Sequence, residues 1–261
     1  MEKTSSFNAH IPVKSSFICG NPWLHFPVVD STNSWLLKNR HLLLEDGLVV
    51  TADEQLEGRG KCERVWECGV KGNLICSMVI HPCLSKKLLS SITLILGLGI
   101  FDALTRLSIK GLSLKWPNDL LINGMKVCGI LCELAYFEDK PVVVAGFGLN
   151  IAGGKEQFSQ GIQGKVTTIE EASGLKPDRF LVLEHIVHCT KSLLEQAYSG
   201  GFHRLLNRWE ALSCSIGKRL AFMEGGEPMT GVFRGLDSLG RVMVQMNDGR
   251  VMPVISGEMM E

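Results

Sequence analysis

Apolar and polar positions along the chain form blocks that predict both strands and helices. Residues 73–82 and 141–152 are almost continuously apolar and are bounded by turn residues, which is typical of buried strands. Two further strand candidates, residues 113–124 and 126–137, meet at an Asn-Gly pair, and such a pair favours a tight hairpin. A hairpin among buried strands indicates a mixed or antiparallel sheet.

Helical signals appear in four regions of the chain. Residues 85–108 are apolar nearly all round and charged at both ends, which predicts a long, mostly buried helix. The Ser-Thr-Asn run at 31–33 precedes apolar residues at helical spacing, as expected for a capped short helix. Residues 167–174 and 178–213 predict further helices, the second of them broken by the glycine pair at 200–201.

The pattern changes at about Ser213, after which short strands alternate with turns. This alternation predicts a small β-barrel of roughly 50 residues appended to a larger domain. We therefore expect two domains, residues 1–213 and 214–261, and an α+β fold in which helices flank a mixed or antiparallel sheet. Residues 1 to about 20 are polar and aperiodic, and they predict a loose tail or an edge element.

The bulk composition argues against several classes of protein. Lysine plus arginine equals aspartate plus glutamate, at 27 each, so no overall field favours nucleic acid or an acidic membrane as the partner. The N-terminus has no apolar run of signal-peptide length, and the apolar run at 92–101 is shorter than a bilayer span. The nine cysteines are an odd, scattered set that is typical of reduced thiols. These features predict a cytoplasmic protein whose anion sites are local.

The segment GRGKCERVW, residues 58–66, combines glycines with basic side chains. Arg59, Lys61 and Arg64, together with the N–H groups of a glycine-rich loop, suit a phosphate or a carboxylate ligand. The segment is neither a Walker A loop nor a dinucleotide fingerprint. A solvated basic turn has the same composition, so the loop by itself leaves both interpretations open.

A second cluster, KWPND at 115–119, interrupts an apolar strand. Pro117 removes a ladder donor and forces the preceding residue to be extended, so the strand lies at an edge or is broken here. Lys115 in an apolar surround needs an anion, which is either Asp119 in a structural pair or a substrate phosphate. In the second case Asn118 or Asp119 would help to hold the magnesium of a nucleotide.

The third signal is GFGLN at 146–150, which ends an apolar strand. Its glycines would let a ligand lie against the backbone, and Asn150 would hydrogen-bond that ligand. A strand end with a bulge has the same pattern. Residue chemistry alone thus reaches an anion-binding, nucleotide-using α/β enzyme.

The order of these motifs along the chain is more informative than any one of them. DSTN, then QxxGRG, KWPND, KxxGILxE, GxGxN and a small C-terminal barrel resemble the biotin-protein ligase family, from about His25 to the end. The resemblance implies a class II synthetase-like catalytic core with an SH3-like C-terminal barrel. It also implies an enzyme that joins biotin to the α-phosphate of ATP, releases pyrophosphate, and passes biotin from biotinyl-AMP to one lysine of a biotin carboxyl carrier protein, a subunit of acetyl-CoA carboxylase.

The resemblance also assigns roles to individual residues. Lys115 and Arg59 would be the catalytic cations, and Asp119 would hold Mg²⁺. The implied biotin-binding residues are Ser31, Thr32, Asn33, Gln55, Gly58, Arg59, Gly60, Lys61, Lys115, Gly129, Ile130 and Leu131. The implied ATP-binding residues are Arg59, Lys61, Arg64, Trp66, Asn118, Lys126 and Asn150. Fixed cations of this kind would let a carboxylate and a nucleotide lie side by side despite their repulsion.

Two positions depart from the usual pattern of that family, GRGRxGRxW. Lys61 stands where an arginine is usual and loses the planar bidentate fork, which predicts weaker retention of the adenylate. Glu63 stands where a glycine is usual, and it would be unfavourable near phosphates unless it faces solvent or pairs with Arg64. Fewer than about 30 residues precede DSTN, so we expect no winged helix and therefore a ligase without a repressor role.

Two other functions stay open at this level. A lipoate- or octanoate-transferring enzyme has the same fold group, although KWPND, GIL and the C-terminal barrel argue for biotin. The second is a biotin- or nucleotide-binding module without catalysis, which the retained Lys115 disfavours. An exposed sheet edge favours a homodimer, and neither nucleic acid nor a membrane is expected as a partner.

Overall fold

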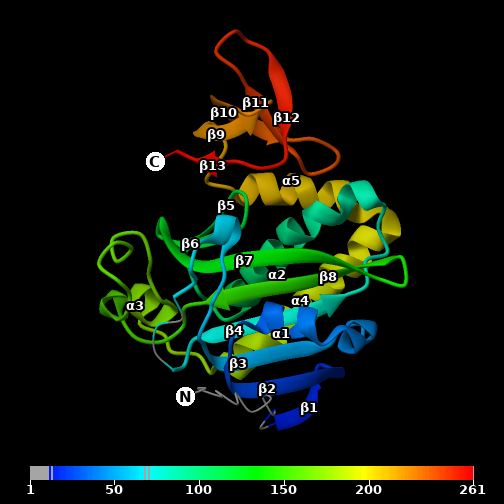
Figure 1. Ribbon diagram of the computed structural model, residues 1–261. Coiled ribbons are helices and arrows are strands. Elements are labelled where there is room, and N and C mark those ends of the chain that lie inside the picture. Colours follow the sequence, from blue (N-terminus) through cyan, green and yellow to red (C-terminus); the bar gives the residue numbers. More distant parts are fainter. Residues whose placement is uncertain (1–11, 13, 68, 70, 261) are drawn as a thin grey trace, which may run out of the picture.

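The computed structural model describes residues 12, 14–67, 69 and 71–260, and it contains two sheets (Figure 1). The larger sheet, with its helices, fills the lower part of the view, and the small C-terminal sheet lies above it. Most of the predicted N-terminal tail lies outside the described residues. The part of it that is described forms an edge strand of the larger sheet, in line with the predicted edge element.

The larger sheet has eight strands of mixed direction, which confirms the predicted sheet type. Its strands are β1 (Lys14–Ile18), β2 (Asn21–Val29), β3 (Val49–Gln55), β4 (Leu74–Ile80), β5 (Leu112–Lys115), β6 (Asp119–Ile122), β7 (Met125–Phe137) and β8 (Lys140–Leu149). Their order is β1-β2-β3-β4-β8-β7-β6-β5. The β2–β3 pair is parallel and the other neighbouring pairs are antiparallel. The strands predicted at 73–82, 126–137 and 141–152 are thus confirmed as β4, β7 and β8.

Helices pack on both faces of this sheet. They are α1 (Thr32–Lys38), α2 (Ile92–Arg106), α3 (Ile169–Ser173), α4 (Arg179–Gln196) and α5 (Phe202–Leu212). The larger core lies between the sheet and the group formed by α2, α4 and α5, whereas α1 covers a smaller core on the other face. The backbone N–H of Ser34 approaches the Ser31 hydroxyl at 3.5 Å, which confirms the predicted helix cap. The break predicted at 200–201 is confirmed as a π-helical turn between α4 and α5.

The segment 113–124 forms two strands, which corrects the prediction of a single interrupted one. β5 ends at Lys115 and β6 begins at Asp119, and these two residues pair across a tight reversal. Pro117 lies in that reversal after a cis peptide bond, where it disturbs no ladder, and β5 is an edge strand. The second reversal uses Asn123 (φ 50°) and Gly124 (φ 82°), so the predicted Asn-Gly hairpin is confirmed.

The long apolar segment differs from its prediction in two ways. A 3₁₀ turn, Lys86–Ser91, precedes α2, so the predicted single helix begins as a tighter coil. By length and composition the combined helical segment Lys86–Arg106 is apolar enough to cross a membrane, which corrects the expectation that this run is too short. In the fold, 67% of its most apolar window is buried inside the protein. That burial is typical of a core helix.

The smaller sheet contains five antiparallel strands in the order β12-β11-β10-β9-β13. They are β9 (Arg219–Glu224), β10 (Glu227–Leu236), β11 (Val242–Gln245), β12 (Val251–Val254) and β13 (Glu258–Met259). The predicted C-terminal β unit is therefore a small sheet. Its closure into an SH3-like barrel and the domain boundary between residues 213 and 214 stay predictions.

The connection between the two sheets is hydrogen-bonded to the KWPND turn. Cys214 donates its backbone N–H to the Leu114 carbonyl at 2.9 Å. The fully buried Ser215 accepts the Trp116 N–H on Oγ at 3.0 Å. The Trp116 ring then contacts Phe233 of β10 edge to face, with centroids 6.4 Å apart. The connection thus holds this region through hydrogen bonds, and the smaller sheet holds the KWPND turn through a ring contact.

A buried histidine lies at the other end of the larger sheet. His25 on β2 is 8% exposed, and its Nδ1 lies 2.9 Å from the Thr51 hydroxyl. Its Nε2 is 3.3 Å from the Asp53 carboxylate, which also pairs with Arg179. Burial lowers the pKa of His25, and the charges of Arg179 and Lys14 lower it further, while Asp53 opposes both effects.

This lowered pKa predicts a pH-dependent stability. The folded state favours neutral His25, so its contribution is complete above the unfolded pKa of about 6.5 and is lost as the pH falls toward the folded pKa. We expect the melting temperature to fall less between pH 7 and pH 5 in His25→Gln than in the wild type. Thermal unfolding at both pH values checks this, with the exposed His188→Gln as control. Parallel curves for the wild type and His25→Gln would contradict it.

Candidate active site

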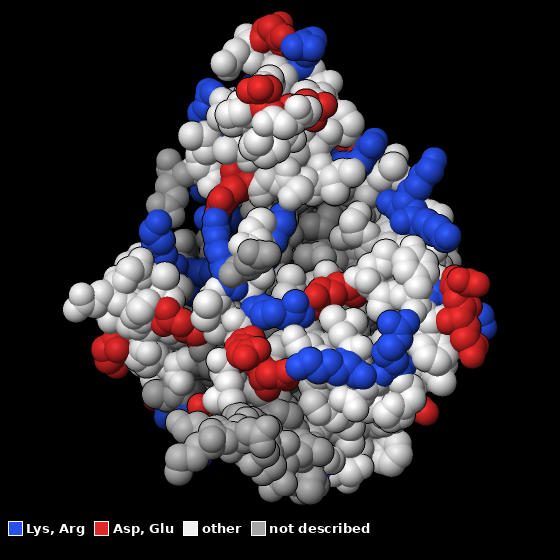
Figure 2. Space-filling model, in the orientation of Figure 1, with Lys and Arg blue, Asp and Glu red and all other residues white. Residues whose placement is uncertain are grey.

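A single cavity of about 1320 Å³ lies between the larger sheet, the segment 59–67, the KWPND turn, the segment 158–166 and the smaller sheet. Figure 2 shows lysine and arginine side chains gathered around a hollow in the middle of this face, beneath the C-terminal sheet. Its described lining includes seven basic residues, namely Arg59, Lys61, Arg64, Lys115, Lys126, Lys165 and Lys218. The carboxylates in the lining are Glu67, Asp119 and Glu258. The chain is neutral overall, but this cavity is locally positive.

The fold brings the predicted site residues to this one cavity from six separate stretches of the chain. The lining contains Ser31, Thr32, Asn33, Gln55, Arg59, Gly60, Lys61, Arg64, Trp66, Lys115, Asn118, Asp119, Lys126, Gly129, Ile130, Leu131 and Asn150. Gly58 is not among the described lining residues. Its carbonyl accepts the Trp66 N–H at 2.9 Å, so it closes the neck of the loop. The ligand contacts expected of all these residues stay predictions.

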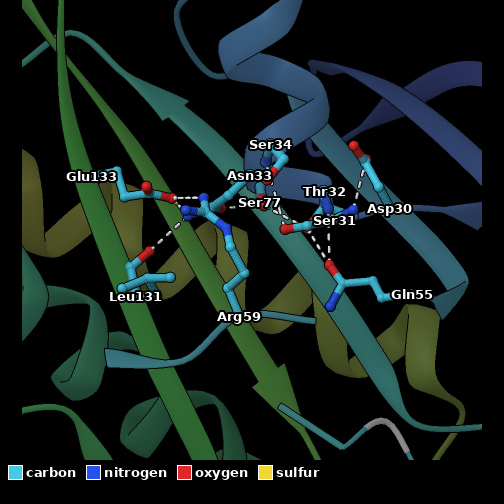
Figure 3. A network of polar contacts seen from close by, with 10 residues as sticks. All are labelled: Asp30, Ser31, Thr32, Asn33, Ser34, Gln55, Arg59, Ser77, Leu131 and Glu133. Atoms are coloured by element: carbon cyan, nitrogen blue, oxygen red, sulfur yellow. Dashed lines mark hydrogen bonds and ion pairs between the residues drawn. The ribbon is translucent and has the colours of Figure 1, made fainter. Parts of the chain in front are cut away.

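One end of the cavity is a neutral polar slot at the start of α1 (Figure 3). The Gln55 amide oxygen accepts the Thr32 N–H at 2.8 Å and lies 3.2 Å from the Thr32 hydroxyl. The Ser77 hydroxyl lies 2.6 Å from Thr32 Oγ1 and 2.5 Å from Asn33 Oδ1. These contacts fix the polar groups of the slot without a net charge, as suits a neutral polar ligand.

The amide of Asn33 is held on both sides by the protein. Its Nδ2 donates to the Leu131 carbonyl at 3.0 Å and to the Glu133 carboxylate at 2.7 Å. Its Oδ1 packs so closely on β8 that a Cβ added to Gly146 would lie 2.3 Å away. This arrangement favours a role for Asn33 in shaping the slot.

The segment from Gly58 to Trp66 folds back on itself as a tight loop. The Gly60 N–H donates to the Arg64 carbonyl at 2.6 Å, and Arg59 forms a bridge with Val65. The predicted glycine-rich loop therefore contains an isolated β-bridge and a 3₁₀ turn, Lys61–Glu63. The side chain of Glu63 lies outside the described ones. Arg64 pairs with Glu258 of β13, and this hydrogen bond raises the pKa of its guanidinium.

Trp66 lies flat against the floor of the cavity. A Cβ added to Gly148 would lie 2.2 Å from the Trp66 Cε2 atom, and one added to Gly129 would lie 2.8 Å from Cζ3. The amine of Lys126 stands over the same indole, 5.5 Å from its centroid. Glycines on β7 and β8 therefore leave the space that the indole occupies.

The basic residues that line the cavity have distinct surroundings. Arg59 Nη2 is 2.5 Å from Glu133 Oε2. Lys126 Nζ is 2.7 Å from Asp119 Oδ1, so Asp119 pairs with Lys126 across the β6–β7 hairpin. Burial lowers the pKa of Lys61, whose amine stands 5.4 Å from the Trp116 ring centroid.

The two asparagines that were predicted to bind ATP hold backbone in place. Asn118 Nδ2 donates to the Ile130 carbonyl at 2.7 Å, and the backbone carbonyl of Asn118 accepts the Ile130 N–H at 2.9 Å. Asn150 is 2% exposed, and its Nδ2 donates to the Thr167 carbonyl at 3.2 Å. Asn118 thus fixes the KWPND turn against β7, and Asn150 fixes the entry to α3.

Sequence reasoning missed three parts of this site. Glu133, whose carboxylate contacts Arg59 and Asn33, was visible only as the last letter of KxxGILxE. The segment from Phe158 to Val166 lines the cavity, and Ser159 anchors it by donating its N–H and hydroxyl to Glu67 at 2.8 and 2.6 Å. The smaller sheet contributes a wall that includes Met223 and Met229. No periodicity or motif in the last two of these parts pointed to the cavity.

The close packing of Trp66 on the floor yields a prediction. Gly148→Ala should displace the indole and lower the free energy of unfolding by about 1–3 kcal/mol, because the added methyl overpacks the contact. The loss should nearly vanish in a Trp66→Ala background, where the clashing ring is absent. Urea unfolding of the four proteins checks this. Gly161→Ala is the control, since a Cβ there meets nothing within 4 Å. An equal loss in both backgrounds would contradict the prediction.

Comparisons with known proteins agree with this geometry. The family model of the Biotin/lipoate A/B protein ligase family matches residues 25–150. The chain is 31% identical to the bifunctional ligase/repressor BirA of Escherichia coli (strain K12) over 233 residues, which cover 89% of this chain and 71% of that protein. It is 30% identical to the biotin--[acetyl-CoA-carboxylase] ligase of Paracoccus denitrificans over 231 residues, which cover 85% of this chain and 93% of that protein.

Among solved structures, a biotin protein ligase from Aquifex aeolicus in complex with biotin and ATP matches with a TM-score of 0.75 at 27% identity. The match covers 91% of this chain and 97% of that one. Motif order, fold and relatives therefore lead to one assignment. The chain belongs to the Biotin/lipoate A/B protein ligase family, and within it to the biotin-protein ligases.

Proposed function

We propose that this chain activates biotin with ATP and transfers it to one lysine of the biotin carboxyl carrier protein of acetyl-CoA carboxylase. The observation that carries the proposal is the convergence of seven basic residues on one cavity whose other end is a neutral polar slot. Such a cavity suits a ligand that is neutral at one end and anionic at the other, next to a polyanion. Biotin and ATP have these properties, and both are present in the Aquifex aeolicus complex.

In the proposed first step, the biotin carboxylate attacks the α-phosphorus of ATP. A C–O–P anhydride forms, and the bond to pyrophosphate breaks. Lys115 and Arg59 would stabilise the charge at the reacting oxygens, whereas Lys61, Arg64 and Lys126 would face the nucleotide phosphates. Positioning and fixed charge provide most of the catalysis in transfers of this kind. Trp66, beside Gly148, would provide an apolar face for the adenine.

In the proposed second step, the amine of the carrier lysine attacks the activated carbonyl. An amide C–N bond forms, AMP leaves, and the proton of the amine passes to solvent or to a neighbouring base. The anhydride would hydrolyse if water reached it, so the loops over the cavity need to be closed between the two steps. The contacts of Glu67 with Ser159 and of Arg64 with Glu258 join the segment 58–67 to two other walls of the cavity.

Asp119 is the protein ligand that we propose for Mg²⁺. The described residues contain no group of three or more His, Cys, Asp or Glu able to hold a metal by themselves. Nucleotide-bound Mg²⁺ needs only one or two carboxylates, because phosphates and water supply the rest, so a single aspartate fits. Asp119 already pairs with Lys126, and the ion would share that carboxylate with the lysine. When bound, Mg²⁺ supplies neutralising charge to the phosphates.

We also propose that the enzyme works in the cytoplasm, where ATP is available and free thiols persist. The eight described cysteines are all free. A homodimer through the edge strand β1 is a further proposal. Light scattering of the purified chain measures its mass in solution, and a monomer at all concentrations would contradict it.

The function is tested with purified protein, ATP, Mg²⁺ and biotin. We expect pyrophosphate release with biotin, and mass-detected biotinylation of one lysine when a carrier domain is added. Lipoate and octanoate replace biotin in parallel reactions. Pyrophosphate release with those acids but not with biotin would overturn the proposed substrate. Biotin binding without pyrophosphate release would indicate a module without catalysis.

The role of Lys115 predicts a selective loss of chemistry. Lys115→Gln removes the charge of the side chain and shortens it by one atom while keeping it polar, so the rate of pyrophosphate release should fall about 10²–10³-fold. Its melting temperature should stay close to that of the wild type. Single-turnover kinetics checks this, with the nearby exposed Lys110→Gln as control. A rate within threefold of the wild type, on the order of 0.6 kcal/mol in the barrier, would contradict the role.

The identity of residue 61 should determine how long biotinyl-AMP stays bound. Lys61→Arg restores a planar fork that donates two hydrogen bonds to one phosphate, so labelled biotinyl-AMP should dissociate up to about tenfold more slowly. A chase with unlabelled biotin and ATP measures the rate. Lys218→Arg, elsewhere in the cavity lining, is the matched control. No slowing in Lys61→Arg would refute the expected advantage of arginine.

A further inference from the structure

We infer that Glu133 is a positioning residue of the biotin site, whose carboxylate holds Arg59 and Asn33 in place before biotin arrives. The inference rests on the proposed function. Figure 3 shows the side chain of Glu133 reaching from β7 toward Asn33 and Arg59. No sequence signal beyond the last letter of KxxGILxE singled it out.

One oxygen atom makes both contacts. Glu133 Oε2 accepts from Asn33 Nδ2 at 2.7 Å and from Arg59 Nη2 at 2.5 Å. Asn33 belongs to α1 and Arg59 to the loop after β3, which are 100 and 74 residues away from Glu133 in the chain. A single carboxylate on β7 therefore links two walls of the polar slot.

The charge of Glu133 matters to Arg59 more than to Asn33. An amide donor is satisfied by any oxygen acceptor, whereas a guanidinium gains strength and direction from an ionised one. The Glu133–Asn33 contact would survive replacement of the carboxylate by a carboxamide. The Arg59–Glu133 contact would lose most of its attraction. This difference separates a positioning role toward Arg59 from simple support of Asn33.

The Arg59–Glu133 pair is suited to order a side chain rather than to stabilise the fold. The side chains of Arg59 and Glu133 are 41% and 25% exposed, so water screens their attraction, and a pair of this kind adds little to folding stability. The contact involves Nη2, and a guanidinium has five N–H donors, so Arg59 keeps donors for an incoming carboxylate while Glu133 holds it. Ordering Arg59 in advance removes that cost from ligand binding.

The effect on binding follows from this ordering cost. Immobilising one rotamer-rich side chain on binding weakens affinity by about two- to tenfold. Glu133→Gln should therefore weaken biotin binding by about that factor and raise the leak of biotinyl-AMP to biotin and AMP in the absence of a carrier. The KM for ATP and the melting temperature should stay near the wild-type values. If the role of Glu133 were only to support Asn33, its replacement would instead lower the melting temperature.

The closing experiment is a cycle of four proteins, namely wild type, Glu133→Gln, Arg59→Ala and the double variant, with Glu133→Ala measured beside them. Biotin affinity is measured by isothermal titration, and adenylate leak by AMP formation. We expect Glu133→Gln to weaken biotin binding in the wild type but not in the Arg59→Ala background, because the group that it positions is then absent. Glu138→Gln, an exposed glutamate in the turn after β7, is the control.

The outcomes distinguish the inference from the function. Equal effects of Glu133→Gln in both backgrounds, or no effect in the wild type, would overturn the positioning role while leaving the ligase activity intact. An effect confined to Glu133→Ala, with a lowered melting temperature, would reduce Glu133 to a support for Asn33 and would also overturn the inference. Failure of the wild type to release pyrophosphate overturns the proposed function, whereas the biotin titrations still decide the role of Glu133.

Discussion

Mutual repulsion among the basic residues around one cavity is the constraint on which the rest of the site depends. Seven lysines and arginines line a single space in a chain of zero formal charge. Charges of one sign that line the same cavity disfavour the compact state unless nearby carboxylates offset them. Glu133, Asp119 and Glu258 each lie against a different one of these cations. The charge of these cations is thus already balanced in part by the protein, and three of them are held in place.

These ion pairs also connect separate layers of the fold. Arg64 and Glu258 join the Gly58–Trp66 loop to the smaller sheet, and Arg59 and Glu133 join the same loop to β7. Trp116 lies between the two sheets, with Phe233 edge to face and the amine of Lys61 over its ring. One short loop is therefore held from three directions. The conformation of this loop therefore depends on the larger sheet, the KWPND turn and the smaller C-terminal sheet together.

Much of this fold could be predicted from local patterns, because its strands and helices follow local rules. The apolar run that became β4, the Asn-Gly hairpin and the cap at Ser31 depend on neighbours in sequence. The reversal at Pro117 was only half predicted, since a break is visible in the sequence but the direction of the chain after it is not. The apolar run at 92–101 was judged shorter than a bilayer span, but the 3₁₀ turn before α2 extends it into a helical segment, 86–106, that is long and apolar enough.

The contacts that define the site are not local, and this limits what a sequence can predict. Glu133 reaches partners 74 and 100 residues away, and no propensity or period records such a pairing. The segment at 158–166 enters the cavity because Ser159 binds Glu67 across 92 residues. The resemblance to a known family assigned residues from distant parts of the chain to one site, which propensity and periodicity cannot do.

The hydrogen bond from Trp116 to Ser215 is another contact between distant parts of the chain, and it has a consequence for protein engineering. A chimera that exchanges the C-terminal unit between relatives has to carry residues 112–119 and 213–217 from one parent, because the two segments form a single joint.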